Sequence, residues 1–184
     1  MNKKPKLLWI GDDLRMSSGV STQLRELVLG IVDKYDICAI GGAIQHPEAG
    51  KVVDLSDATK QLTGVQDAYV RLYPTNGYGD ENLIFSIINQ EKPNALCMIT
   101  DPRYYGWLFN IEKQIRALMP ICYHNLWDDL PYPMWNRPGY MSCDALFSIS
   151  KQSYNINKWV VGPELCCDVN GNTFDEFGKV IKND

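Results

Sequence analysis

Residues 7–29, LLWIGDDLRMSSGVSTQLRELVL, decide the fold of this chain. An apolar run ends at Gly11, and a polar turn over residues 12–19 follows it. A buried strand that leads through a turn of small residues into a helix is typical of α/β proteins, in which the helix N-terminus offers backbone N–H groups to an anion. The helix is predicted because apolar residues recur at the spacing of one helical face: Val20, Leu24, Leu27, Val28 and Ile31.

The same alternation continues along the chain. Two further helices are expected, one with Leu83, Ile84, Ile87 and Ile88 on its apolar face and one with Leu108, Ile111, Ile115 and Leu118. Residues 45–63 are polar and weakly patterned, with one short strand expected at 51–55, and three prolines exclude a single regular helix over 131–140. Apolar runs typical of strands follow the first one at 36–42, 67–73, 95–100, 121–123 and 145–150.

Strands that are apolar throughout and alternate with helices favour a parallel sheet covered on both faces. The predicted fold class is therefore α/β, a Rossmann-like three-layer domain with a mostly parallel sheet. This domain is expected to span residues 1–160, and residues 161–184 are expected to form a polar C-terminal tail.

Composition excludes several classes of protein. The net charge is −4 and the basic residues are scattered, which argues against tight binding to a nucleic-acid backbone. No apolar run approaches the ~20 residues needed to cross a bilayer, and the N-terminal run is too short for a signal peptide, so a cytoplasmic protein is expected. The six cysteines lack the spacing of a zinc site, and we interpret them as reduced thiols.

Four polar clusters follow predicted strands, at residues 12–19, 41–45, 101–103 and 124–129. In an open parallel sheet, ligands gather at the carboxyl ends of the strands. The clusters are separate in the sequence but adjacent in such a fold, and this convergence predicts a site at that edge.

Each candidate residue has a functional and a structural interpretation. Ser17, Ser18 and Gly19 either bind a phosphate at the helix N-terminus or simply cap the helix. Asp101 is either a ligand contact or a helix cap, and His124 is either a general base or substrate contact or a structural residue. His46 lies in the weakly patterned segment and is not expected to be functional.

The proline-rich segment offers aromatic rings beside carboxylates. Trp127 and Trp135 lie near Asp128 and Asp129, a combination that suits stacking on a sugar or a base. The alternative is a loop held against the domain by its own aromatic residues. The acidic pairs do not have the spacing of a dedicated metal site, so no resident metal is expected.

Several motifs together resemble the GT-B glycosyltransferases of the large retaining family 4. These are LLWIGDDLRMSSGVSTQLREL, PNALCMITDP and PICYHNLWDDLPYPMWNRPGYMSCDALFSIS, in this order over residues 6–160. The chain is most similar to glycosyltransferase-like proteins of tailed phages, which implies a location in the host cytoplasm.

The resemblance implies retaining transfer of a sugar from a nucleotide diphosphate sugar to an acceptor, with no bound cofactor. Residues 17–19, with Ser18 and Gly19 foremost, would then lie beside the donor diphosphate, and His124 would contact the transferred sugar. Asp12, Asp101 and residues 127–129 would face the acceptor side, with His124 and Asp101 as the catalytic candidates.

The chain differs from that family in having only one Rossmann-like unit. A GT-B enzyme places its site between two such domains, and no second alternating set follows residue 160. The chain is expected to be a fragment, to pair with a second GT-B half, or to act alone as a non-catalytic binding module with the same fold. A different α/β nucleotide-binding enzyme is a further alternative. Nucleic acid enters only as one of the conceivable acceptors, beside cell-surface glycans and small molecules.

Overall fold

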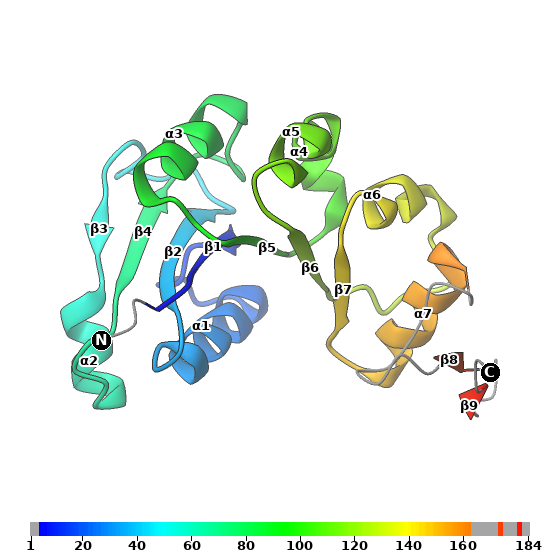
Figure 1. The fold of residues 1–184 in the computed structure, drawn as a ribbon, viewed down its shortest axis with the longest axis horizontal. Coiled ribbons are helices and arrows are strands. Elements are labelled where there is room, and N and C mark those ends of the chain that lie inside the picture. The colour runs from blue at the N-terminus through cyan, green and yellow to red at the C-terminus, as the bar shows by residue number, and fades with distance from the viewer. Residues whose placement is uncertain (1–3, 163–172, 175–179, 182–184) are drawn as a thin grey trace.

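The computed structural model describes residues 4–162, 173–174 and 180–181. A seven-stranded sheet, in the order β3-β4-β2-β1-β5-β6-β7, crosses the domain (Figure 1). All of its pairings are parallel except that of β3 with β4. The strands are β1 (Lys6–Asp12), β2 (Asp36–Gly42), β3 (Val53–Asp54), β4 (Val70–Pro74), β5 (Ala95–Ile99), β6 (Ile121–Asn125) and β7 (Ala145–Ser148).

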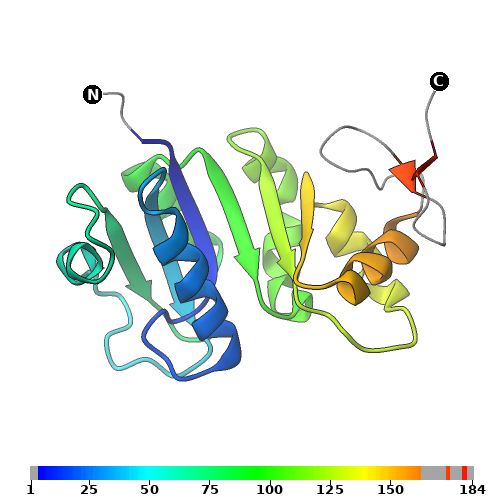
Figure 2. The ribbon, with the colours of Figure 1, turned by 90° about the horizontal axis from the view of Figure 1, so that it is seen from below.

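Helices lie on both faces of this sheet, as the alternating pattern predicts. Figure 2 shows α1 across one face, near β1 and β2. The α-helices are α1 (Gly19–Ile31), α2 (Ser56–Thr63), α3 (Glu81–Glu91), α4 (Gly106–Asn110), α5 (Glu112–Arg116), α6 (Arg137–Met141) and α7 (Lys151–Val161), and the 3-10 helices are η1 (Pro102–Tyr105) and η2 (Met134–Asn136).

Two apolar cores sandwich the sheet because successive strand residues point to opposite faces. In β1, Leu8 and Ile10 belong to the core formed with α3 to α7, whereas Trp9 belongs to the core formed with α1. The predicted three-layer, Rossmann-like α/β class is therefore confirmed.

Three details differ from the predicted elements. The segment expected to be an excursion contains α2, which pattern analysis misses because only Ser56 and Thr59 are buried and Leu62 is exposed. The expected single helix around Leu108–Leu118 is broken into η1, α4 and α5. Leu118 is exposed, so it does not share the buried face. Helix α7 has no counterpart among the expected elements.

The far C-terminus lies largely outside the described residues. Within it, β8 (Thr173–Phe174) pairs antiparallel with β9 (Val180–Ile181). Cys38, Cys97, Cys122 and Cys143 are free thiols, whereas Cys166 and Cys167 fall in the part that is not described. No helix among the described residues has the length and apolar character needed to span a membrane.

Candidate functional site

The direction of winding of the sheet reverses between β1 and β5. From β1 the chain proceeds through β2 to β4 on one side, and then crosses to β5, β6 and β7 on the other side. Such a reversal leaves a crevice outside the carboxyl ends of the two central strands, which is where open α/β sheets bind ligands. The predicted residues at positions 12, 101 and 124–129 all follow or end β1, β5 or β6.

Asp12 ends β1 and is held by three hydroxyl groups. Ser18 Oγ donates to Asp12 Oδ2 at 2.6 Å, and Tyr78 OH donates to Oδ1 at 2.9 Å. Thr100 Oγ1 donates to the same Oδ1 at 3.4 Å. Asp12 is buried, and within the described parts of the chain it has no ion-pair partner. A buried carboxylate held by hydroxyl groups alone therefore lies at the switch point.

The N-terminus of α1 is partly used by the protein itself. Ser18 is its N-cap, and Ser18 Oγ accepts from Ser21 N at 3.0 Å, as the capping interpretation predicts. Gly19 faces open space, because a Cβ added there has no neighbour within 4 Å. Ser17 is exposed. The turn thus has room for an anion at Gly19. The Ser18 hydroxyl, in contrast, already donates its hydrogen bond to Asp12.

Asp13, which belongs to the predicted polar cluster at residues 12–19, contacts His46, and the sequence pattern does not predict this contact. Arg15 and His46 both contact its Oδ2, at 2.8 Å and 2.9 Å. Burial raises the pKa of Asp13, but the hydrogen bonds and charge of Arg15 outweigh this and lower it overall. Glu48 N donates to His46 Nδ1 at 3.1 Å, so Nε2 carries the proton toward Asp13. Both His46 nitrogens are thus engaged, and the cluster joins the loops after β1 and β2.

Thr100, the residue that follows β5, has a φ of 111°. This is an outlier for a β-branched residue, and such strain persists only where the surroundings impose it. Tyr123 OH donates to Thr100 O at 2.5 Å, and Tyr105 OH donates to Ile99 O at 2.6 Å. Two buried tyrosines therefore fix the backbone at the end of β5, and sequence pattern alone does not reveal this.

Asp101 caps η1 and pairs with Arg103. Its Oδ1 accepts from Arg103 N at 2.9 Å, and its Oδ2 lies 2.5 Å from the guanidinium. Burial raises the pKa of Asp101, but the hydrogen bonds and charge of Arg103 outweigh burial and lower it. Asp101 is therefore ionised at neutral pH and acts as a hydrogen-bond acceptor rather than as an acid.

A cleft of about 390 Å³ opens at this edge of the sheet and brings several predicted residues together. We call it the switch-point cleft. Arg103 lies over the Trp127 ring, 5.6 Å from its centroid. The lining of the switch-point cleft includes Val20, Thr100, Asp101, Arg103, Trp127, Asp128 and Asp129.

The loop that carries Trp127 is held to the domain by hydrogen bonds through Asn125. Trp127 N donates to Asn125 Oδ1 at 3.0 Å, and Asn125 Nδ2 donates to Tyr140 OH at 2.9 Å and to Asn157 Oδ1. The loop is thus pinned to the domain, while Trp127 remains half-buried and part of the cleft. The two interpretations of this loop are therefore compatible: its backbone is held against the domain, and its Trp127 ring is available for stacking.

His124 is not among the residues that line the cleft. It is half-buried, and it alternates along β6 with the buried Tyr123 and Asn125. Burial lowers the pKa of His124, so its imidazole is neutral at pH 7. The structure therefore gathers Asp12, Ser18, Asp101 and residues 127–129 around one edge, but it does not bring His124 into the cleft.

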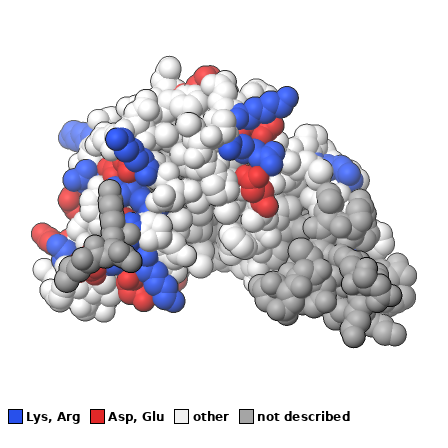
Figure 3. Space-filling view, in the orientation of Figure 1, with Lys and Arg blue, Asp and Glu red and all other residues white. Residues whose placement is uncertain are grey.

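The electrostatics of the cleft disfavour an anionic ligand. Three carboxylates, those of Asp101, Asp128 and Asp129, line it with one guanidinium, that of Arg103. On the face drawn in Figure 3, the described basic and acidic residues are interspersed, with no patch of one sign. Aromatic and carboxylate groups suit a polyhydroxylated ring. Within the part of the chain that the structure describes, no group of three or more His, Cys, Asp or Glu side chains is arranged to hold a metal ion.

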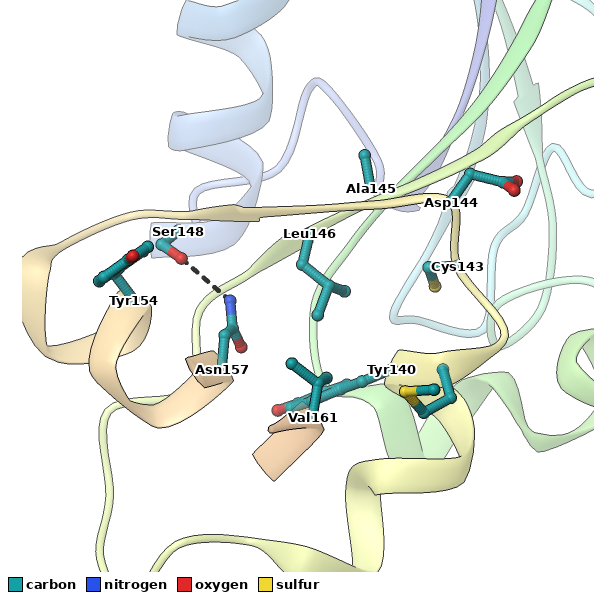
Figure 4. Close-up of a pocket in the computed structure, with 10 residues that line it drawn as sticks. Tyr140, Cys143, Asp144, Ala145, Leu146, Ser148, Tyr154, Asn157 and Val161 are labelled. Carbon is teal, nitrogen blue, oxygen red and sulfur yellow. Dashed lines mark hydrogen bonds between the residues drawn. The ribbon is translucent and has the colours of Figure 1, made fainter. Parts of the chain in front are cut away.

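A second cavity, of about 460 Å³, lies beside β7 between α6 and α7 (Figure 4). Tyr140, Leu146 and Val161 give it apolar walls. Its Asn157 amide is used within the protein, because Nδ2 donates to Ser148 Oγ at 2.9 Å. None of the predicted site residues lines this cavity, so we place the candidate site at the switch-point cleft.

Comparison of the chain with protein-family models, with curated proteins and with solved structures gave no match. The fold is therefore established by the structure alone, and the likeness to GT-B glycosyltransferases stays a prediction.

Proposed function

We propose that this chain is the acceptor-side half of a retaining glycosyltransferase. The complete enzyme would transfer a sugar from a nucleotide diphosphate sugar to a hydroxylated acceptor. The observation that carries the proposal is the switch-point cleft, in which Trp127 and three carboxylates line an opening at the reversal between β1 and β5. The motif resemblance over residues 6–160 supports the reaction class.

The residues of the cleft take complementary roles in this proposal. Trp127 stacks on a sugar ring, because its aromatic face suits the apolar C–H face of a pyranose. Asp128 and Asp129 accept hydrogen bonds from sugar hydroxyls. Asp101, held ionised by Arg103, orients the acceptor hydroxyl.

The donor side of the reaction uses the N-terminus of α1. Its positive end and the open position at Gly19 support binding of a diphosphate and stabilise that group as it leaves. His124 is assigned to the transferred sugar by the resemblance. We propose that a second Rossmann-like half, on this polypeptide or on a separate chain, supplies the remaining donor contacts.

A non-catalytic sugar-binding module is the second candidate. It is favoured by the Asp12 carboxylate, whose Oδ2 lies 2.6 Å from Ser18 Oγ at the start of α1. A negative charge at this position opposes a phosphate there.

Calorimetric titration with UDP-, GDP- and ADP-glucose separates the two candidates. We expect one nucleotide sugar to bind saturably to the wild type and to fail to bind Gly19→Asp, because the new carboxylate repels the diphosphate. Gly30→Asp on the same helix is the matched control. A Cβ at Gly30 also meets open space, so binding should persist in this variant. Absence of binding by all three compounds would overturn the donor role assigned to the N-terminus of α1.

A further inference from the structure

We propose that a second sugar subsite adjoins the switch-point cleft across Arg103, so that the acceptor is a neutral oligosaccharide rather than a single sugar. This inference rests on the proposed function, because it takes the cleft to be the acceptor site. The second subsite is a hollow of about 370 Å³ between η1, α4 and the loop with η2, and we call it the outer hollow.

The cleft and the outer hollow share a wall. Pro102 and Arg103 line both, so the two spaces lie side by side on the same edge of the domain. The lining of the outer hollow also contributes uncharged polar groups, the amides of Asn110 and Asn136 and the hydroxyl of Ser142. Ser142 Oγ donates to Pro138 O and Asn136 Nδ2 donates to Tyr140 OH within the protein. These two side chains therefore offer their oxygens as acceptors, and the Asn110 amide offers both a donor and an acceptor to sugar hydroxyls.

Two tryptophans connect the sites. Trp127 lines the cleft and Trp135 lines the outer hollow, and their ring centroids are 6.1 Å apart at an interplanar angle of 74°. Trp135 is 60% exposed. Leu130, Tyr132 and Met134 of the same loop are exposed as well. A contiguous exposed apolar patch of this kind marks a binding surface. The angle between the rings fits a saccharide that bends between the unit on Trp127 and the unit on Trp135.

The charges indicate a neutral chain rather than a nucleic acid. Single-stranded nucleic acids also stack on aromatic rings, but their sites track the phosphate backbone with basic groups. Among the described residues, Arg103 is the one basic side chain that lines either space, and it is paired with Asp101. Asp128 and Asp129 add negative charge on the cleft side.

The indole N–H resonances of the five tryptophans test the proposal by NMR. The probes are methyl glycosides of glucose, galactose and mannose, linear neutral tri- and tetrasaccharides of the same sugars, and oligo(dT). We expect a monosaccharide to shift only the Trp127 signal, and an oligosaccharide to shift both Trp127 and Trp135 and to bind about tenfold more tightly. Trp9 lies in the core, so its signal serves as an internal reference.

Substitutions of single tryptophans test whether Trp135 provides the tighter binding of oligosaccharides. Trp135→Ala should abolish the tenfold gain with chain length while monosaccharide affinity stays unchanged, and Trp135→Phe should restore part of the gain. Trp159→Ala is the matched control, because Trp159 is also exposed but lines neither space.

Three other outcomes would contradict the outer subsite, the proposed function or the choice of ligand. A shift confined to Trp127 with no gain from chain length overturns the outer subsite and leaves the proposed function standing. An absence of shifts with every saccharide contradicts the proposed function itself. Salt-dependent shifts of both signals with oligo(dT), in the absence of saccharide binding, would assign the surface to nucleic acid instead.

Discussion

Thr100 has a strained backbone conformation and also lines the switch-point cleft. Its φ is 111°, its carbonyl accepts from Tyr123 OH, and its hydroxyl donates to Asp12. Residues held in such conformations carry a cost of about 1–3 kcal/mol and cluster at functional sites. The strain belongs to the same edge of the sheet as the cleft.

This strain predicts an inverted ranking of two substitutions. Thr100→Ala removes the hydroxyl but keeps a Cβ in the strained conformation, whereas Thr100→Gly removes the hydroxyl and relieves the strain. We therefore expect the glycine variant to be more stable than the alanine variant by about 1 kcal/mol, measured by urea denaturation. The opposite ranking, which is usual at unstrained positions, would show that the backbone at residue 100 is relaxed.

Glu91 has a buried carboxylate, and the groups that donate hydrogen bonds to it come from residues distant in the sequence. Its oxygens accept from Lys6 Nζ at 2.6 Å, from Tyr69 OH at 2.9 Å and from Tyr73 OH at 2.5 Å. Burial raises the pKa of Glu91, but the hydrogen bonds from Lys6 and the two tyrosines prevail and lower it to about 2. The folded state therefore favours the ionised form.

A lowered carboxyl pKa stabilises the protein above the ordinary value of 4.5 and ceases to do so as the pH falls toward 2. The wild type should lose about 3 kcal/mol of unfolding free energy from this group between pH 5 and pH 2. Glu91→Gln should be less stable at pH 7 and should show a smaller loss over that range. Glu81→Gln, at an exposed position in the first turn of the same helix, is the control and should follow the wild-type profile. A Glu91→Gln profile parallel to that of the wild type would contradict this assignment.

Helix α1 is the element that links the fold to the proposed donor site. Ser18 Oγ both caps the helix and donates to Asp12, so one side chain fixes the helix start and the end of β1. Ser18→Ala should lower the unfolding free energy by about 1 kcal/mol, because it removes the cap and leaves Asp12 with one hydrogen bond fewer. Ser17→Ala, at the exposed neighbouring position, should leave stability nearly unchanged in the same thermal and urea measurements. Equal effects of the two substitutions would show that Ser18 is not the cap.

At the scale of the whole molecule, the sequence predicts the layout better than the contacts. The strands, the helix after β1 and the three-layer class follow from apolar periodicity, and the gathering of Asp12, Asp101 and residues 127–129 follows from parallel topology. These features depend on local patterns, which a single sequence displays.

The remaining features depend on residues that are distant in the sequence. The bond from Tyr78 to Asp12 joins residues 66 positions apart, and His46 reaches Asp13 only because the loops after β1 and β2 lie side by side. The strained Thr100 accepts a hydrogen bond at its carbonyl from Tyr123, a residue 23 positions away. Helix α2 buries too few apolar residues to show a helical period. Strand register and loop packing decide these contacts, and neither is encoded in local spacing.

Saturation-transfer NMR with neutral methyl glycosides tests most directly whether the switch-point cleft binds a sugar. We expect saturation to pass from the protein to at least one glycoside in the wild type and in Trp159→Ala, and to be lost in Trp127→Ala. Transfer that persists undiminished in Trp127→Ala, or that is absent with every glycoside, would contradict the assignment of the cleft as an acceptor site.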